Sequence, residues 1–173
     1  MARAIAFAHA TDVDGAADAL AACPPMDGSA CNAVASLGTP VLTSCSTSPA
    51  PTMTGGALAD GNYVLTSDVL YLSSPYEPSC AAVGLPTGGP STWTVRIADN
   101  CFESVSTTEE AGIATANSNF SVDGNLLELV ETCPASGMTT YPFTATATSL
   151  TVLVPWTIGL VEMQTFTLQG EGG

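Results

Sequence analysis

The chain has 173 residues, of which 46% are hydrophobic and 10% are charged, so it can form one domain with a tail or two small units with an apolar core. Sixteen Asp and Glu residues against only two basic ones, Arg3 and Arg96, give a net charge of −14. Proteins bind nucleic acid by neutralising phosphates with Lys and Arg, so the composition argues against a nucleic-acid partner. The acidity indicates high solubility, with divalent cation binding or a salty habitat as the alternatives.

Residues 1–56 lack a regular pattern and are predicted to form an irregular N-terminal segment and linker. The start, MARAIAFAHA, faintly resembles a signal peptide, but its apolar run falls short of the roughly 7–15 residues of a working one. The run Thr39–Cys45 could add an edge strand, and residues 45–56 are rich in Ser, Thr, Pro and Gly, as linkers are. No stretch reaches the roughly 18 apolar residues that cross a membrane as a helix, so no transmembrane segment is expected.

The stretch DVDGAADALAACP, Asp12–Pro24, is similar to a thrombospondin type 3 calcium repeat. Asp12, Asp14, Asp18 and Cys23 fall in register with that pattern, whereas its fourth acidic position is Ala21 here. The resemblance implies a weak calcium site on the three Asp residues, and the alternative is a solvated acidic linker. The stretch LAAC, which ends at Cys23, also fits a bacterial lipidation motif on that cysteine. The resemblance to the calcium repeat accounts for the same residues without a lipid.

From Asp60 onward, short β-branched and aromatic runs alternate with turn signals, which is the all-β pattern. Asp99-Asn100 is expected to form a tight turn, and Asp123-Gly124 is a type I′ hairpin signal. The predicted strands are Asn62–Leu72, Ser91–Ala98, Cys101–Thr108, Gly112–Val122, Asn125–Cys133, Thr139–Ala147, Ser149–Pro155 and Val161–Gln169.

About eight strands in residues 57–173 predict a single antiparallel β-domain. No amphipathic run of helix length separates them, so parallel strand–helix–strand units are not expected. Short turns between successive strands favour an up-and-down meander, which eight strands can close into a small barrel without edges. A β-sandwich is the alternative.

Six cysteines, an even and widely spaced set, indicate disulfides formed in an oxidising compartment, which points to an extracellular or cell-surface protein. A zinc site is not favoured, because no Cys-x-x-Cys pair exists and His9 is the only histidine. The six positions allow fifteen pairings. They are Cys23, Cys31, Cys45, Cys80, Cys101 and Cys133.

The residues that carry enzymatic chemistry are sparse, and no enzymatic activity is expected. His9 lies far from every predicted strand, so neither a Ser nor a Cys nucleophile has a base. Glu128 and Glu131 are three apart on one strand and therefore point to opposite faces. Asp68 lies within a strand and could point inward, as could Glu103, but nothing in the sequence pairs them.

Aromatic and aliphatic side chains are the remaining candidates for function, because an eight-stranded barrel is either filled by side chains or holds one small ligand. On strict alternation, Tyr63 and Tyr71 share one face of the first strand with Leu65 and Val69. Arg96 is expected on the outer face beside acidic neighbours. The candidate lining residues for a small apolar ligand are Tyr63, Leu65, Tyr71, Trp93, Tyr141, Phe143 and Phe166.

The motifs ACNAV, GGALADGNYVLTS, VETCP, YPFTATATSLTV and QTFTLQ together resemble a group of uncharacterised secreted or lipid-anchored proteins of myxobacteria-like bacteria. The resemblance covers residues 30–169. It implies a small, disulfide-stapled, lipocalin-like β-domain exported from a bacterial cell, and it implies no particular chemistry.

The family pattern also implies a disulfide between Cys31 and Cys133, because the matching cysteines recur together. The remaining cysteines then pair best as Cys80–Cys101 and Cys23–Cys45. The expected function is a non-enzymatic binder of a small apolar ligand, without a cofactor other than the weak calcium site. The alternative is a structural subunit of a surface layer or filament that self-associates through the N-terminal segment or an edge strand.

Overall fold

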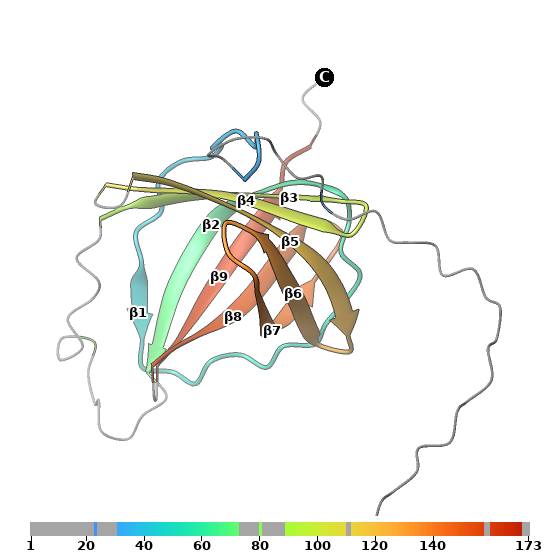
Figure 1. Cartoon of the computed structure of the whole chain (residues 1–173). Helices are drawn as coiled ribbons and strands as arrows, with labels where there is room; N and C mark the ends of the chain where they lie inside the picture. Colours follow the sequence, from blue (N-terminus) through green and yellow to red (C-terminus); the bar gives the residue numbers. More distant parts are fainter. Residues whose placement is uncertain are drawn as a thin grey trace, which may run out of the picture.

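The fold is a closed antiparallel barrel of eight strands with one additional strand on its wall (Figure 1). The computed structural model describes residues 23, 31–72, 80, 89–109, 112–157 and 160–170, with only the backbone for residues 156 and 157. Among the described residues, no helix is long and apolar enough to cross a membrane. The strands are β1 (Ser44–Ser46), β2 (Gly61–Leu72), β3 (Ser91–Ala98), β4 (Cys101–Thr108), β5 (Gly112–Asp123), β6 (Leu126–Cys133), β7 (Gly137–Ala145), β8 (Ser149–Thr157) and β9 (Leu160–Leu168).

The strand order is the up-and-down order that the sequence predicts. Each strand from β2 to β9 pairs with the next in antiparallel fashion, and β2 also pairs with β9, which closes the sheet. The barrel is therefore confirmed over the sandwich, and the eight strands predicted from Asn62 onward are all found within two residues of their predicted ends. The edge strand expected in Thr39–Cys45 is the shorter β1, Ser44–Ser46. Closure pairs the backbone groups that an open sheet would leave free on its edges.

Two tight turns explain why the hairpins form where the sequence signals them. Asp99 and Asn100 join β3 to β4 with φ angles of 48° and 65°, the left-handed pair that a type I′ turn requires. At the second hairpin, Asp123 still pairs with Leu126, so the two loop residues are Gly124 and Asn125. Only Gly124 has a positive φ, 61°, which fits a type II′ turn rather than the predicted type I′ turn.

A β-bulge in β2 changes which side chains face the barrel interior. The register with β9 shifts between Leu65 and Ser67, which inserts one extra residue into the strand. Tyr63 and Leu65 are buried inside, and after the bulge the buried inward position is Asp68. A shift of one residue exchanges the two faces of a strand, so Tyr71 lies on the outer face. The prediction that Tyr71 shares a face with Tyr63 is therefore wrong.

The hydrophobic core fills one end of the barrel, which we call the closed end. A segment before β2 seals this end, because the Gly55 N–H donates to Phe143 O at 2.8 Å and the Ala145 N–H donates to Gly55 O at 3.0 Å. The buried core residues are Tyr63, Leu65, Val95, Ile97, Leu127, Phe143, Leu150, Val152 and Phe166.

Part of the predicted irregular segment belongs to the barrel wall. β2 pairs with β3 only over Gly61–Val64, and β1 then runs parallel to Val69–Tyr71 of β2. Val41 bridges to Ser91 at the start of β3 through two backbone hydrogen bonds of 2.8 and 2.9 Å. The N-terminal segment thus fills the gap where β2 and β3 separate, as Figure 1 shows for β1.

Three disulfides hold the N-terminal half to the barrel. Cys31–Cys133 is confirmed, whereas the other two predicted pairs are wrong: the bonds are Cys23–Cys101 and Cys45–Cys80. The pairing follows spatial neighbours, which the sequence does not reveal. Cys45 lies on β1 next to β2, whose end leads to Cys80, and Cys23 lies over the start of β4. Because its sulfur is bonded to Cys101, Cys23 has no free thiol for a lipid.

Candidate functional site

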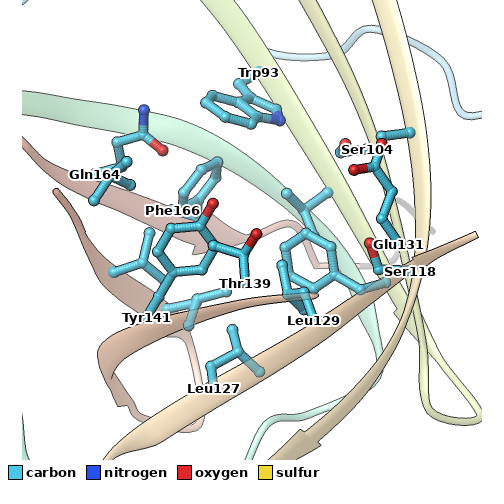
Figure 2. A pocket seen from close by; sticks show the side chains of 16 residues that line it. Trp93, Ser104, Ser118, Leu127, Leu129, Glu131, Thr139, Tyr141, Gln164 and Phe166 are labelled. Atoms are coloured by element: carbon cyan, nitrogen blue, oxygen red, sulfur yellow. The ribbon is translucent and has the colours of Figure 1, made fainter. Parts of the chain in front are cut away.

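The barrel contains a cavity of about 190 Å³ between the packed core and the opposite end, which we call the open end (Figure 2). Thr139, which lines the cavity, is an exposed residue, so the cavity reaches the surface. Its lining residues come from seven strands, β3 to β9, and are Trp93, Val95, Phe102, Ser104, Ala116, Ser118, Leu127, Leu129, Glu131, Thr139, Tyr141, Leu150, Val152, Val154, Gln164 and Phe166.

Strand alternation explains this lining. Every second residue of each strand points inward, so β6 contributes Leu127, Leu129 and Glu131 in order from the closed to the open end. Aromatic rings form one wall, where Trp93 and Phe166 meet edge to face with their centroids 5.9 Å apart and an interplanar angle of 82°. The cavity is therefore apolar toward the core and more polar toward its mouth.

The strands β7 and β8 separate beside the cavity. They pair only from Phe143 to Ala145 of β7, near the closed end. Toward the open end, Tyr141 on β7 and Val152 and Val154 on β8 line the cavity on the two sides of this separation. Unlike the gap between β2 and β3, this one is not bridged by another described segment.

The structure divides the predicted ligand-binding residues into three groups. Trp93, Tyr141 and Phe166 line the cavity. Tyr63, Leu65 and Phe143 are buried, and they form the core beneath the cavity together with part of its lining. Tyr71 lies on the outer face. These three groups are the aromatic and aliphatic candidates Tyr63, Leu65, Tyr71, Trp93, Tyr141, Phe143 and Phe166.

Sequence reasoning missed the polar residues of the lining, Glu131 and Gln164 above all. The signal for Glu131 was available, because it is two residues beyond Leu129 on an alternating strand and so shares its face. Gln164 is buried, and its Nε2 donates a hydrogen bond to Glu162 Oε1 at 2.8 Å. The Trp93 indole N–H is buried and has no hydrogen-bond partner among the described residues.

A pair of carboxyl groups, Asp68 and Glu162, lies next to Gln164 on the inner faces of β2 and β9. Asp68 is only 5% exposed, and its Oδ2 accepts a hydrogen bond from Thr43 Oγ1 at 2.6 Å. Burial, together with the charge of Asp68, raises the pKa of Glu162 from 4.5 to about 7. Protonated Glu162 can donate a hydrogen bond to Asp68, and this also favours its neutral form.

The acid pair predicts an unusual dependence of stability on pH. Because the pKa of Glu162 is higher in the folded chain, the folded state binds more protons, and stability falls as pH rises from about 4.5 to about 7. We expect Glu162→Gln to raise the free energy of unfolding by about 1–2 kcal/mol relative to wild type at pH 8 and by much less at pH 4.5, after allowing for solvent screening.

Urea denaturation of both proteins across this pH range measures the difference. Glu128→Gln is the matched control, because Glu128 is a partly buried carboxylate on the outer side of β6, and this variant should follow the wild type. A constant difference between Glu162→Gln and wild type at all pH values would contradict the raised pKa.

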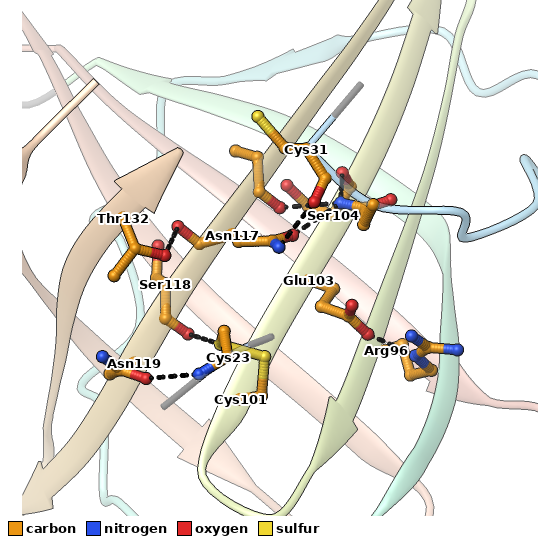
Figure 3. Close-up of a disulfide and its surroundings, with 12 residues drawn as sticks. Cys23, Cys31, Arg96, Cys101, Glu103, Ser104, Asn117, Ser118, Asn119 and Thr132 are labelled. Carbon is orange, nitrogen blue, oxygen red and sulfur yellow. Dashed lines mark hydrogen bonds and ion pairs between the residues drawn. A yellow bond between two sulfur atoms is a disulfide. The ribbon is translucent and has the colours of Figure 1, made fainter. Parts of the chain in front are cut away.

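Other polar groups are buried on the outer face of the barrel, beneath the N-terminal segment (Figure 3). Asn32 Nδ2 donates to Asn117 Oδ1 and to Ala116 O, both at 2.9 Å, and Asn117 Nδ2 donates to Cys31 O at 2.6 Å. Glu103 is also buried there and forms an ion pair with Arg96, which confirms the outward position predicted for Arg96. This network fixes the N-terminal segment and is separate from the cavity.

The predicted calcium ligands Asp12, Asp14 and Asp18 lie outside the described residues, as does His9. Within the described ranges, no group of three or more His, Cys, Asp or Glu side chains could hold a metal ion. No family model, curated protein or solved structure matches this chain. The resemblances to the bacterial family and to the calcium repeat therefore stay predictions.

Proposed function

We propose that this chain is a non-enzymatic, exported binding protein that holds one small ligand with an apolar body inside its barrel. The observation that carries the proposal is the cavity of about 190 Å³ lined by Trp93, Tyr141, Phe166 and aliphatic side chains. Tightly packed interiors contain few voids larger than a water molecule. A cavity of about 150 Å³ accepts benzene, so this one suits a single ring with a short substituent.

Export to the exterior of a bacterial cell is part of the proposal. The three disulfides join segments that are 35 to 102 residues apart, and such bonds persist in oxidising environments. They are consistent with an extracellular protein. The resemblance to secreted and lipid-anchored bacterial proteins supports the bacterial cell surface in particular.

The acid pair is the feature that an enzyme would need, because a carboxyl group with a raised pKa can act as a general acid. Neither Asp68 nor Glu162 is part of the cavity lining, however, and Asp68 is buried behind its neighbours. A substrate in the cavity would meet Gln164 first. This arrangement supports binding rather than catalysis.

A second candidate function, assembly into a larger structure, is favoured by the outer surface of β6 and β7. Val130 and Met138 are cross-strand partners there, with 42% and 67% of their surfaces exposed. The open-end half of β7 also lacks a described neighbour on its β8 side. An added strand or a second copy could pair with such an edge.

Native mass spectrometry of unreduced protein from its own source distinguishes these two functions. A mass increase from one co-purified small molecule on the monomer supports the binding function and gives the mass of the ligand. A ladder of oligomers without a bound small molecule supports assembly and contradicts the binding proposal.

Filling the cavity should abolish binding, and two adjacent threonines offer a matched pair of variants. Thr139 lines the cavity, whereas Thr140 points outward. Both residues are exposed, so either position tolerates a large side chain. With neutral 2-phenylethanol as the probe, we expect Thr139→Trp to weaken binding at least about tenfold and Thr140→Trp to bind like wild type.

Isothermal titration calorimetry measures both affinities, and thermal unfolding confirms that both variants fold. Equal affinity in Thr139→Trp and wild type would place the ligand elsewhere on the protein.

A further inference from the structure

We infer that the cavity selects small organic cations, namely a protonated amine carried on a body the size of one aromatic ring. This inference rests on the proposed binding function and specifies its ligand class. It is carried by the charge of the barrel interior, by the hydrogen-bond acceptors on the cavity wall, and by the aromatic rings that face them.

The charged groups of the interior are all acidic among the described residues. Glu131 lines the cavity, and the Asp68–Glu162 pair lies on the inner faces of β2 and β9 next to Gln164. The described cationic side chain, Arg96, is on the outer face and is bound to Glu103. In a partly enclosed apolar site, such fixed charges act through a low dielectric and favour a cation over an anion.

The hydrogen bonds of the wall leave acceptors for the ligand. Gln164 Nε2 donates one of its two N–H groups to Glu162 Oε1, and the carbonyl oxygen of Gln164 is an acceptor for the ligand. In Figure 2 this oxygen lies on the side of Phe166, while Glu131 comes from the opposite wall. An ammonium group, which has three donors and no acceptor, matches acceptors of this kind.

Aromatic side chains complete a site of the kind that binds ammonium groups. Trp93, Tyr141 and Phe166 line the same cavity, and a cation within about 6 Å of such a ring is attracted by its negatively polarised face. The apolar body of the ligand would contact Leu127 and Leu129 toward the core.

An independent observation comes from Asp68. Its side chain is nine-tenths buried and points into the barrel opposite Gln164, and its Oδ1 has no hydrogen-bond donor among the described residues unless Glu162 is protonated. A buried acceptor without a donor is unfavourable, and a positive charge in the adjacent cavity reduces that cost.

One feature of the wall favours the opposite charge and defines the competing outcome. The Trp93 indole N–H is a buried donor without a partner in the described structure, and a carboxylate ligand could accept a hydrogen bond from it. Three probes of nearly the same shape separate these cases: 2-phenylethylamine is a cation at neutral pH, 2-phenylethanol is neutral, and phenylacetate is an anion.

Isothermal titration calorimetry of the whole chain with the three probes tests the inference. We expect the amine to bind about tenfold more tightly than the alcohol, and phenylacetate to bind more weakly than the alcohol. Glu131→Gln should bring the affinity for the amine to within about threefold of that for the alcohol, both measured on this variant. Glu128→Gln, on the same strand but pointing outward, should change neither affinity.

Salt provides a second measurement that does not depend on how Glu131→Gln folds. Raising the ionic strength from about 0.01 M to about 1 M shortens the screening length from roughly 30 to 3 Å, so it should weaken the amine but not the alcohol. If the alcohol or phenylacetate binds as tightly as the amine, the cation inference is overturned while the binding function stands. If none of the three binds, the proposed function fails as well.

Discussion

Removing the Cys31–Cys133 disulfide by the double substitution Cys31→Ala and Cys133→Ala is expected to lower the free energy of unfolding by about 4–5 kcal/mol. The bond closes a loop whose ends are 102 residues apart, so its loss gives the unfolded chain much more conformational freedom. Cys31 is also buried against the outer face, where the adjacent Asn32 and Asn117 form their hydrogen bonds. Both effects act in the same direction.

Urea denaturation of the variant and of wild type measures the loss. The two other disulfides are the controls, because they close loops of 78 and 35 residues and Cys45 is only partly buried. Because Cys23–Cys101 and Cys31–Cys133 overlap along the chain, each closes a much shorter loop while the other is intact, so loop length predicts similar costs for all three bonds. The partial exposure of Cys45 then predicts that losing Cys45–Cys80 costs the least, and the burial of Cys31 that losing Cys31–Cys133 costs the most. If the Cys45–Cys80 variant is as destabilised as the Cys31–Cys133 variant, the buried contacts of Cys31 add nothing to the loss of loop closure.

Gly55→Ala is expected to destabilise the fold by about 3 kcal/mol, because it opens the closed end of the barrel. Gly55 has a φ of 74°, and a Cβ atom there would lie 2.2 Å from the backbone oxygen of Gly124. The segment would have to move away, and its two hydrogen bonds to Phe143 and Ala145 would break. The Phe143 side chain, which is fully buried, would then lose part of its cover.

Gly124→Ala separates the effect of space from that of backbone conformation. Gly124 has a similar φ of 61°, but a Cβ atom there would meet nothing within 4 Å, so we expect a loss of only about 1 kcal/mol. Thermal and urea unfolding of both variants provide the comparison. Equal losses would show that the close approach at Gly55 does not hold the closed end together.

Most of the fold could be predicted from local patterns. Ser91–Ala98 and Cys101–Thr108 have the boundaries that the sequence predicts, because strict alternation and the Asp99-Asn100 turn define them within a few residues. Among the cavity residues, Trp93, Tyr141 and Phe166 were predicted for the same reason. In each case the information lies within a window shorter than one hairpin.

The bulge in β2 shows where such patterns stop. No residue near Thr66 signals an inserted position, yet the shift between Leu65 and Ser67 turns Asp68 inward and Tyr71 outward. The acid pair could not be predicted, because Asp68 and Glu162 are 94 positions apart and meet only through the β2–β9 pairing that closes the barrel. Two of the three disulfides were mispaired because β1 lies beside β2 through a long-range parallel pairing.

The sequence by itself determined the all-β class, the positions of the strands, the antiparallel order and the acidic, cation-poor character of the chain. These properties follow from composition, from the two-residue period of strands and from turn residues, all of which act locally. Only the tertiary structure decided the register of β2 with β9, the fit of β1 into the wall, and therefore which carboxyl groups lie beside the cavity. Those features depend on contacts between distant strands, whose relative register is selected by the packing of the whole barrel.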